Sequence, residues 1–243
     1  MRSLWTAAGL VCIATVTPAF ATISFIGTQA GLGADDSTNW AQLGGDQTAL
    51  TGGFSATSGL GIGITGSFSV SNGLVAVVCP ASPNCSWTTS GTGMSGGDST
   101  IWAFDNGTGL GTGPISLAFS KALIGGGAWL QADTSGAYTA SIQAFNGSTS
   151  LGTFTLASDA SGDPVFLGVL ESPATANITK LVFALTACAS GCTNLGDFAI
   201  DKLFMNDPAS TVPEPPSLLL LGCGLAGMAW AFRKRSSRNG SRS

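Results

Sequence analysis

Residues 138–156 read YTASIQAFNGSTSLGTFTL, and this stretch decides the fold. From Tyr138 to Ala144 every second residue is apolar, which is the period of a β-strand with one buried face. Asn146-Gly147 follows, a dipeptide typical of tight hairpin turns. Apolar residues then recur from Leu151 to Leu156. We therefore predict a β-hairpin at this point of the chain.

The same alternation recurs along most of the sequence. A second pair, Asn72-Gly73, lies between two apolar runs and predicts another hairpin. No window between Thr22 and Thr211 has the period of an amphipathic helix. We expect an all-β fold, a jelly-roll-like β-sandwich of short strands. Further strands are predicted at 60–70, 74–78, 101–104, 115–119, 165–170, 181–185 and 197–205.

The N-terminal 21 residues have the layout of a secretory signal peptide, whose apolar part is expected to be helical. Arg2 precedes an apolar segment, and Ala19-Phe20-Ala21 is a small-x-small cleavage site. The mature chain is therefore expected to begin at Thr22.

An uncharged apolar run lies near the other terminus, from Ser217 to Phe232. Its 16 residues would form a helix of roughly 24 Å, slightly short of a hydrocarbon core of about 30 Å. The basic cluster that follows is expected to hold its end of the helix in the cytoplasm. We therefore predict a single transmembrane helix in the lipid bilayer, with the preceding domain outside. The cluster consists of Arg233, Lys234 and Arg235.

The predicted organisation has five parts. Residues 206–216 are polar and rich in proline, so they are expected to form an extended linker. The parts are a signal peptide at 1–21, a β-sandwich at 22–205, the linker at 206–216, a transmembrane helix at 217–232 and a basic cytoplasmic tail at 233–243.

The linker ends in Val212-Pro213-Glu214-Pro215, just before the apolar run. This box, a short membrane helix and an arginine cluster, in that order, resemble the PEP-CTERM sorting signal of exported bacterial proteins. The resemblance implies that a membrane-embedded exosortase recognises the box and trims or transfers the protein. Upstream, DSTNWAQLG at 36–44 resembles a segment near the start of a group of such proteins. Three later segments resemble their jelly-roll domains, which look like carbohydrate-binding modules: IQAFNG at 142–147, FLGV at 166–169 and FAID at 198–201.

The exported part is acidic. Between Thr22 and Thr211 there are three lysines, no arginine and 12 of the 13 acidic residues, so the formal charge is 3 − 12 = −9. Nucleic acids are bound mainly by neutralising phosphates with basic side chains. A nucleic-acid partner is therefore not expected.

Four of the six cysteines fall in the exported part, namely Cys79, Cys85, Cys188 and Cys192. Four cysteines allow three disulfide pairings. We favour Cys79 with Cys85 and Cys188 with Cys192, because each pair brackets a short turn-rich loop. Zinc is the alternative, but the chain has no histidine and neither spacing is Cys-x-x-Cys.

The sequence is poorly suited to catalysis, so we expect no enzymatic activity. Without histidine there is no Ser-His-Asp or Cys-His arrangement. A two-carboxylate glycosidase using Glu171 is the least implausible enzyme, and it would need a second carboxyl group across a cleft.

Two binding hypotheses remain. Tryptophans, foremost Trp40 and Trp102, could offer flat faces to sugar rings, although such side chains also fill sandwich cores. Loops rich in aspartate could hold a structural calcium ion, although turn capping is the alternative. The resemblance to carbohydrate-binding modules singles out Asp201 for calcium. No other cofactor is expected.

These observations predict an exported, non-catalytic protein of the cell surface or exopolysaccharide (biofilm) matrix, anchored or processed through its tail. The alternative is a carbohydrate-binding module that attaches to extracellular polysaccharide.

Overall fold

The protein is represented by a computed structural model that describes residues 22–68, 74–78, 87, 94, 98–104, 111–172, 174–189 and 195–208, with the backbone alone at 74–78. The chain divides into two units, Met1–Asp207 and Pro208–Ser243, and the fold described below is that of the first.

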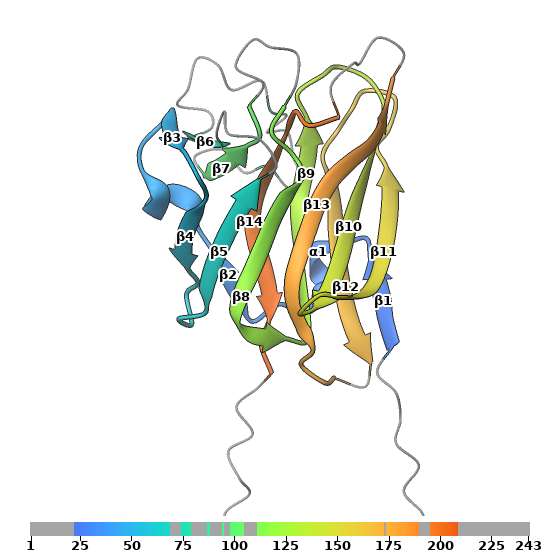
Figure 1. The fold of residues 1–243 in the computed structure, drawn as a ribbon. Helices are drawn as coiled ribbons and strands as arrows, with labels where there is room; N and C mark the ends of the chain where they lie inside the picture. The colour runs from blue at the N-terminus through green and yellow to red at the C-terminus, as the bar shows by residue number, and fades with distance from the viewer. Residues whose placement is uncertain are drawn as a thin grey trace, which may run out of the picture. The chain divides into compact units, whose positions relative to one another are not determined.

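The first unit is a sandwich of two antiparallel β-sheets (Figure 1). Sheet A has the strand order β1-β12-β9-β14-β7-β6-β3, and β2 also pairs with β14. Sheet B has the order β11-β10-β13-β8-β5-β4. The predicted all-β sandwich is therefore confirmed, whereas the two predicted flanking helices lie outside the described residues.

The strands of sheet A are β1 (Thr22–Ile26), β2 (Asp36–Thr38), β3 (Thr48–Leu50), β6 (Leu74–Val78), β7 (Ser99–Trp102), β9 (Gly125–Ala132), β12 (Val165–Ser172) and β14 (Phe198–Asn206). Those of sheet B are β4 (Phe54–Thr57), β5 (Gly63–Phe68), β8 (Ile115–Leu123), β10 (Tyr138–Asn146), β11 (Thr149–Ala157) and β13 (Ile178–Cys188). Two single-turn helices, α1 (Gln29–Leu32) and η1 (Trp40–Leu43), lie between strands of sheet A. In the described part of the chain, no helix has the length and apolar content needed to cross a bilayer.

The core lies between the sheets and is built from the alternating residues of each strand. Ile142, Leu117 and Phe183 from sheet B are fully buried, as are Leu130 and Leu203 from sheet A. Burying such a side chain contributes about 1.5–3 kcal/mol relative to leaving it exposed. The apolar residues at every second position of the sequence are therefore the side chains on the inner faces of the two sheets.

One of the two predicted hairpins is confirmed and the other is wrong. β10 and β11 pair up to Asn146 and Thr149, and Gly147 has a φ of 57°, which suits glycine in a tight turn. By contrast, β5 and β6 lie in different sheets. Asn72-Gly73 therefore does not join paired strands. Alternation predicts a strand but not its partner, which is chosen by the whole sandwich.

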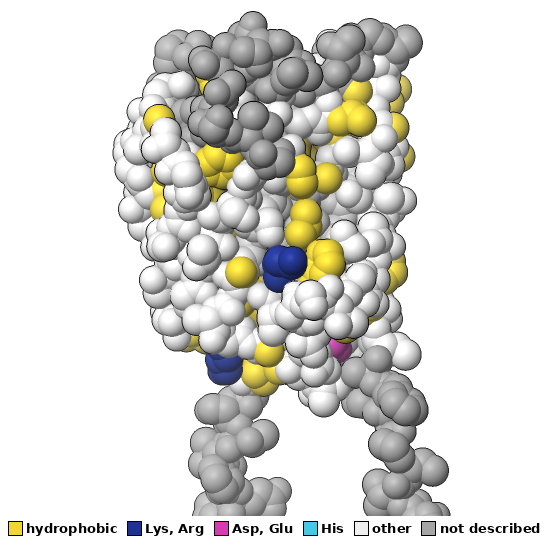
Figure 2. All heavy atoms as spheres, viewed as in Figure 1, with side chains coloured by type: hydrophobic (Ala, Val, Ile, Leu, Met, Phe, Trp, Pro, Cys, Tyr) yellow, Lys and Arg dark blue, Asp and Glu magenta, His cyan; other side chains and the backbone are white. Residues whose placement is uncertain are grey.

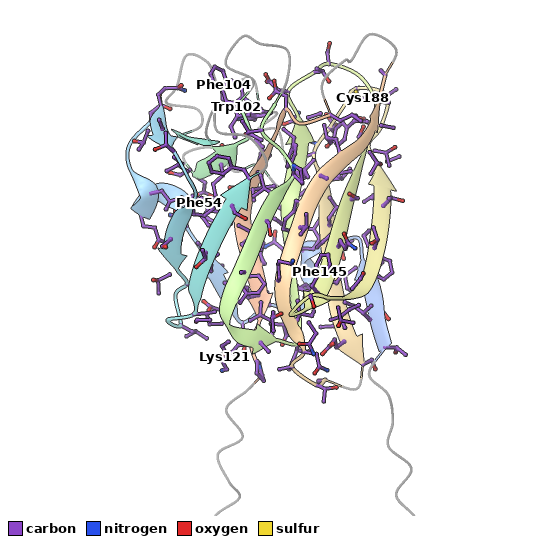
Figure 3. The ribbon with its side chains drawn as sticks, viewed as in Figure 1. Phe54, Trp102, Phe104, Lys121, Phe145 and Cys188 are labelled. Atoms are coloured by element: carbon purple, nitrogen blue, oxygen red, sulfur yellow. The ribbon has the colours of Figure 1, made fainter. Side chains whose placement is uncertain are left out.

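Both ends of the folded unit lie at the same end of the sandwich. By strand register Ser24 is opposite Leu170, Leu170 is opposite Gly125, and Gly125 is opposite Asn206. β1 therefore begins at the level where β14 ends. Figure 3 places Lys121 at this end and Trp102 and Cys188 at the opposite one.

Candidate functional site

A cleft of about 820 Å³ lies beside β14, between α1, β2 and the turn that joins β4 to β5. We call it the α1–β14 cleft. Its lining is Gln29, Ala30, Gly33, Ala34, Asp35, Asp36, Ser37, Gly59, Leu60 and Phe204. Phe204 alternates with the buried core residues Leu203 and Met205, so its ring lies on the outer side of sheet A.

The ring of Phe204 belongs to a row of aromatic side chains on three adjacent strands. Trp129 and Phe166 have ring centroids 5.6 Å apart at 68°, and Phe166 and Phe204 have theirs 6.2 Å apart at 57°. Phe166 is only 1% exposed, so the middle of the row is fixed. Tilted and edge-on contacts of this kind are favoured by the ring quadrupole. Phe204 is therefore a half-buried ring on a rigid support.

Gln29 lies at the start of α1 and is held by the same row. Trp129 Nε1 donates to Gln29 Oε1 at 3.0 Å, which leaves the two amide hydrogens of Gln29 pointing away from the tryptophan. The short helix is capped at both ends. Thr28 Oγ1 accepts from Gly31 N, and Asn206 Nδ2 donates to the carbonyls of Leu32 and Gly33.

The two carboxylates of the cleft are tied to neighbouring backbone. Asp35 Oδ1 accepts from Asp207 N at 2.9 Å. Asp36 is 6% exposed, and its Oδ1 accepts from the backbone N–H of Ser37 and of Leu60 at 2.8 and 3.0 Å. Asp207 is itself paired with Lys121 at 2.7 Å. The cleft therefore borders the residues at which the folded unit ends.

The face of sheet B is different in character. Over β5, β8 and β13 it shows mainly uncharged side chains (Figure 2). Lys180 of β13 lies over the ring of Phe145, 4.0 Å from its centroid, in a cation–π contact. The α1–β14 cleft, by contrast, lies on the outer side of sheet A and is lined by two carboxylates.

Trp40 does not fit the predicted contact with carbohydrate. It is fully buried, packs edge-on against Phe54 at 5.8 Å, and donates from Nε1 to the carbonyl of Asp201 at 2.9 Å. A ring enclosed in this way cannot offer its face to a sugar. The prediction for Trp40 is therefore corrected to a core residue.

The prediction for Trp102 is also corrected, because Trp102 is buried in a second apolar cluster outside the main core. It is 7% exposed, lies between Trp87 and Phe104, and donates from Nε1 to Asp197 Oδ1 at 2.6 Å. Residues 36–40 (DSTNW) and 98–102 (DSTIW) differ at one position, and each segment contributes a strand that pairs with β14.

Asp201 lies in β14 and is 1% exposed. The register of β14 against β9 shifts between Ile200 and Leu203, and the indole N–H of Trp40 meets the Asp201 carbonyl there. Among the described residues, no three Asp, Glu, Cys or His side chains lie together as metal ligands. Calcium at Asp201 stays a prediction.

Cys188 is the one predicted disulfide cysteine within the described residues. It ends β13 and is disulfide-bonded. Cys79, Cys85 and Cys192 lie outside the described residues, so the favoured pairing of Cys188 with Cys192 stays a prediction. The sorting box Val212–Pro215 and the basic cluster Arg233–Arg235 also lie outside them.

Glu171 does not line the cleft. Its side chain is 4% exposed, and its Oε2 accepts from the backbone and side-chain nitrogens of Asn177 at 3.1 and 3.4 Å. Burial raises the pKa of Glu171, and the bonds from Asn177 offset part of that rise. Glu171 is therefore a buried carboxyl group that binds its proton more tightly in the folded state than in the unfolded state.

Glu171→Gln is expected to weaken the pH dependence of stability. The pKa of Glu171 is higher in the folded protein than its ordinary value of 4.5. Protonated Glu171 therefore contributes its full stabilisation below pH 4.5, and this contribution is lost as the pH rises through the raised pKa. Urea unfolding between about pH 4 and pH 7 should thus show a smaller change in the variant than in the wild type. Equal pH dependence in both proteins would contradict this account of Glu171.

Sequence reasoning missed the α1–β14 cleft. Its lining comes from segments that are far apart in the chain, from Gln29 to Phe204. A local signal was present, since alternation in 203–205 puts Leu203 and Met205 inside and the aromatic Phe204 outside. Nothing in the sequence indicated that Gln29 would lie near it.

Comparison with known proteins identifies one feature of the chain, a sorting motif near its C-terminus. A family model, the PEP-CTERM protein-sorting motif, matches residues 211–235. No curated protein matches the chain. A crystal structure of a DUF4465 family protein from Bacteroides caccae is similar with a TM-score of 0.42 and 10% identity, over 71% of this chain and 100% of that one. The motif implies export, attachment to the membrane through the C-terminal tail and exosortase-related processing there. The chain thus carries a PEP-CTERM protein-sorting motif, which follows the last strand of the β-sandwich in the sequence.

Proposed function

We propose that this protein is a non-catalytic component of the cell surface or of the exopolysaccharide matrix, delivered by its C-terminal sorting motif. The match at residues 211–235 carries the proposal. The predicted signal peptide at 1–21 supports it, because export needs an N-terminal signal. The absence of histidine from the whole chain supports a non-catalytic domain.

The geometry of the folded unit is compatible with this proposal. Thr22 and Asn206 lie at the same end of the sandwich, so the segments predicted to meet the membrane leave from one end. Asp207, at the start of the predicted linker, is held by Asp35 and Lys121.

Deleting residues 217–243 is expected to release the exported domain from the membrane. The apolar run is the segment proposed to hold it there, so its loss should move the protein from the membrane fraction to the periplasm or medium. Fractionation of host cells and intact-mass measurement would show both the location and the ends of the protein.

Replacing Pro213 and Pro215 by alanine tests the box separately from the helix. We expect this variant to stay in the membrane with an uncleaved C-terminus, because the exosortase would no longer recognise it. Pro208→Ala, a change in the same linker outside the box, should be processed like the wild type. The proposal fails if the wild type, the deletion and the box variant share one location and one C-terminal mass.

A further inference from the structure

We propose that the α1–β14 cleft binds a neutral glycan, with the ring of Phe204 as the platform for one sugar and the amide of Gln29 as a hydrogen-bond donor. This goes beyond the sorting function, which depends on the tail alone. It also differs from the expectation based on Trp40 and Trp102, which are buried.

The first argument is the mixture of surfaces in the cleft. Phe204, Leu60 and Ala30 supply apolar area, and Leu60 is 64% exposed at the rim. Gln29 supplies donors and Asp35 supplies acceptors. A pyranose has an apolar face and a rim of hydroxyl groups that both donate and accept. Its two kinds of surface match those of the cleft, as small-ligand sites generally require.

The second argument is that the contacting groups are held from behind. Trp129 fixes the Gln29 oxygen, Asp207 N fixes one oxygen of Asp35, and Phe166 supports the Phe204 ring. Groups that are already ordered lose little conformational entropy when a ligand binds.

The third argument is charge, which selects among glycans. The lining contains two carboxylates and neither lysine nor arginine. A uronic acid would meet like charge without a compensating cation, so its binding is disfavoured. A calcium-bridged acidic sugar is not favoured either, because the described residues contain no group of three potential metal ligands. A neutral glycan meets no such penalty.

The test uses the full chain in a detergent without a sugar headgroup, so that the detergent does not compete. Neutral hexose oligosaccharides and uronate oligosaccharides are titrated separately by calorimetry. We expect saturable binding of at least one neutral oligosaccharide and none of the uronates. Binding of no neutral oligosaccharide, or equal binding of uronates, would overturn the proposal.

Three variants locate the site. Gln29→Ala is expected to weaken binding about three- to tenfold, because it removes one hydrogen-bonding group from an exposed position. Phe204→Ala is expected to weaken it about tenfold or more. Thr153→Ala, an exposed change on β11 of sheet B, is the matched control and should bind like the wild type. Binding unchanged in Gln29→Ala overturns the site even if Phe204→Ala proves unstable.

Asp35→Asn tests the charge argument. The asparagine oxygen can still accept from Asp207 N, so the local fold should persist. We expect neutral binding to stay within about twofold, and the discrimination against uronates to fall. Discrimination equal to that of the wild type would show that charge does not select the ligand. Because these measurements use purified protein, their failure leaves the tail-dependent location untouched.

Discussion

Trp40→Ala is expected to lower the free energy of unfolding by about 3–5 kcal/mol. Trp40 is fully buried against Phe54, so the substitution leaves a cavity in the core beside η1. It also removes the indole N–H that donates to the Asp201 carbonyl where the register of β14 shifts. Urea unfolding followed by fluorescence or circular dichroism would measure the loss.

Trp40→Phe separates the two causes. A phenylalanine keeps most of the buried volume but has no N–H, so the expected loss is about 1–3 kcal/mol. Trp129→Phe is the matched control, since it removes an indole N–H from a half-buried site where water can replace the bond to Gln29. We expect the control to lose less stability than Trp40→Phe. Equal stability of Trp40→Phe and the wild type would show that the bond to Asp201 contributes nothing.

Gly127→Ala is expected to destabilise the sandwich by about 1–3 kcal/mol through overpacking. Gly127 lies in β9, in the middle of sheet A, where an added Cβ would come within 2.6 Å of the Leu167 carbonyl oxygen and 2.7 Å of the Gly168 Cα. Both are backbone atoms of β12, so the two strands would have to separate. Thermal or urea unfolding would measure the effect.

Gly45→Ala is the matched control for this prediction. A Cβ added there meets no atom within 4 Å, and the residue is exposed. We expect a change within about 0.5 kcal/mol. If Gly127→Ala were as stable as Gly45→Ala, the close packing of β9 against β12 would not need a glycine.

Gly127→Ala should also disturb the aromatic row beneath the cleft, because the Cβ added at residue 127 would lie 2.9 Å from the Phe166 ring.

Local sequence patterns predicted the secondary structure well. The alternation in 138–144 appears as the buried face of β10, and the turn after Asn146 joins it to β11. The hairpin predicted from the second Asn-Gly pair was wrong, because a turn signal reflects only about four residues. The sheet that each strand joins depends instead on all the strands that bury a face in the core. β6 pairs with β3 and β7 in sheet A, whereas the strand before it in the chain, β5, lies in sheet B.

The candidate site was much harder to predict. Tryptophan is a common sugar-stacking residue, yet both predicted tryptophans are buried and their N–H groups find acceptors. Trp40 lies in the main core, and Trp102 lies in a second cluster with Trp87, Met94 and Ala199. The cleft is lined instead by Phe204, a half-buried ring that its position between two core residues places on the outer side of sheet A. Which aromatic side chain is left at the surface is decided by the packing of the whole sandwich.

By itself, the sequence determined the all-β class and the sorting motif. Both depend on residues that are contiguous in the chain: a two-residue period for strands, and one short box before an apolar run and a basic cluster. Only the tertiary structure decided the sheet of each strand, the burial of the tryptophans and the existence of the α1–β14 cleft. The cleft brings together Gln29 and Phe204, which are far apart in the sequence. Such contacts form when the two sheets pack against each other, and this packing depends on all the strands together. It cannot be predicted from a short stretch of sequence.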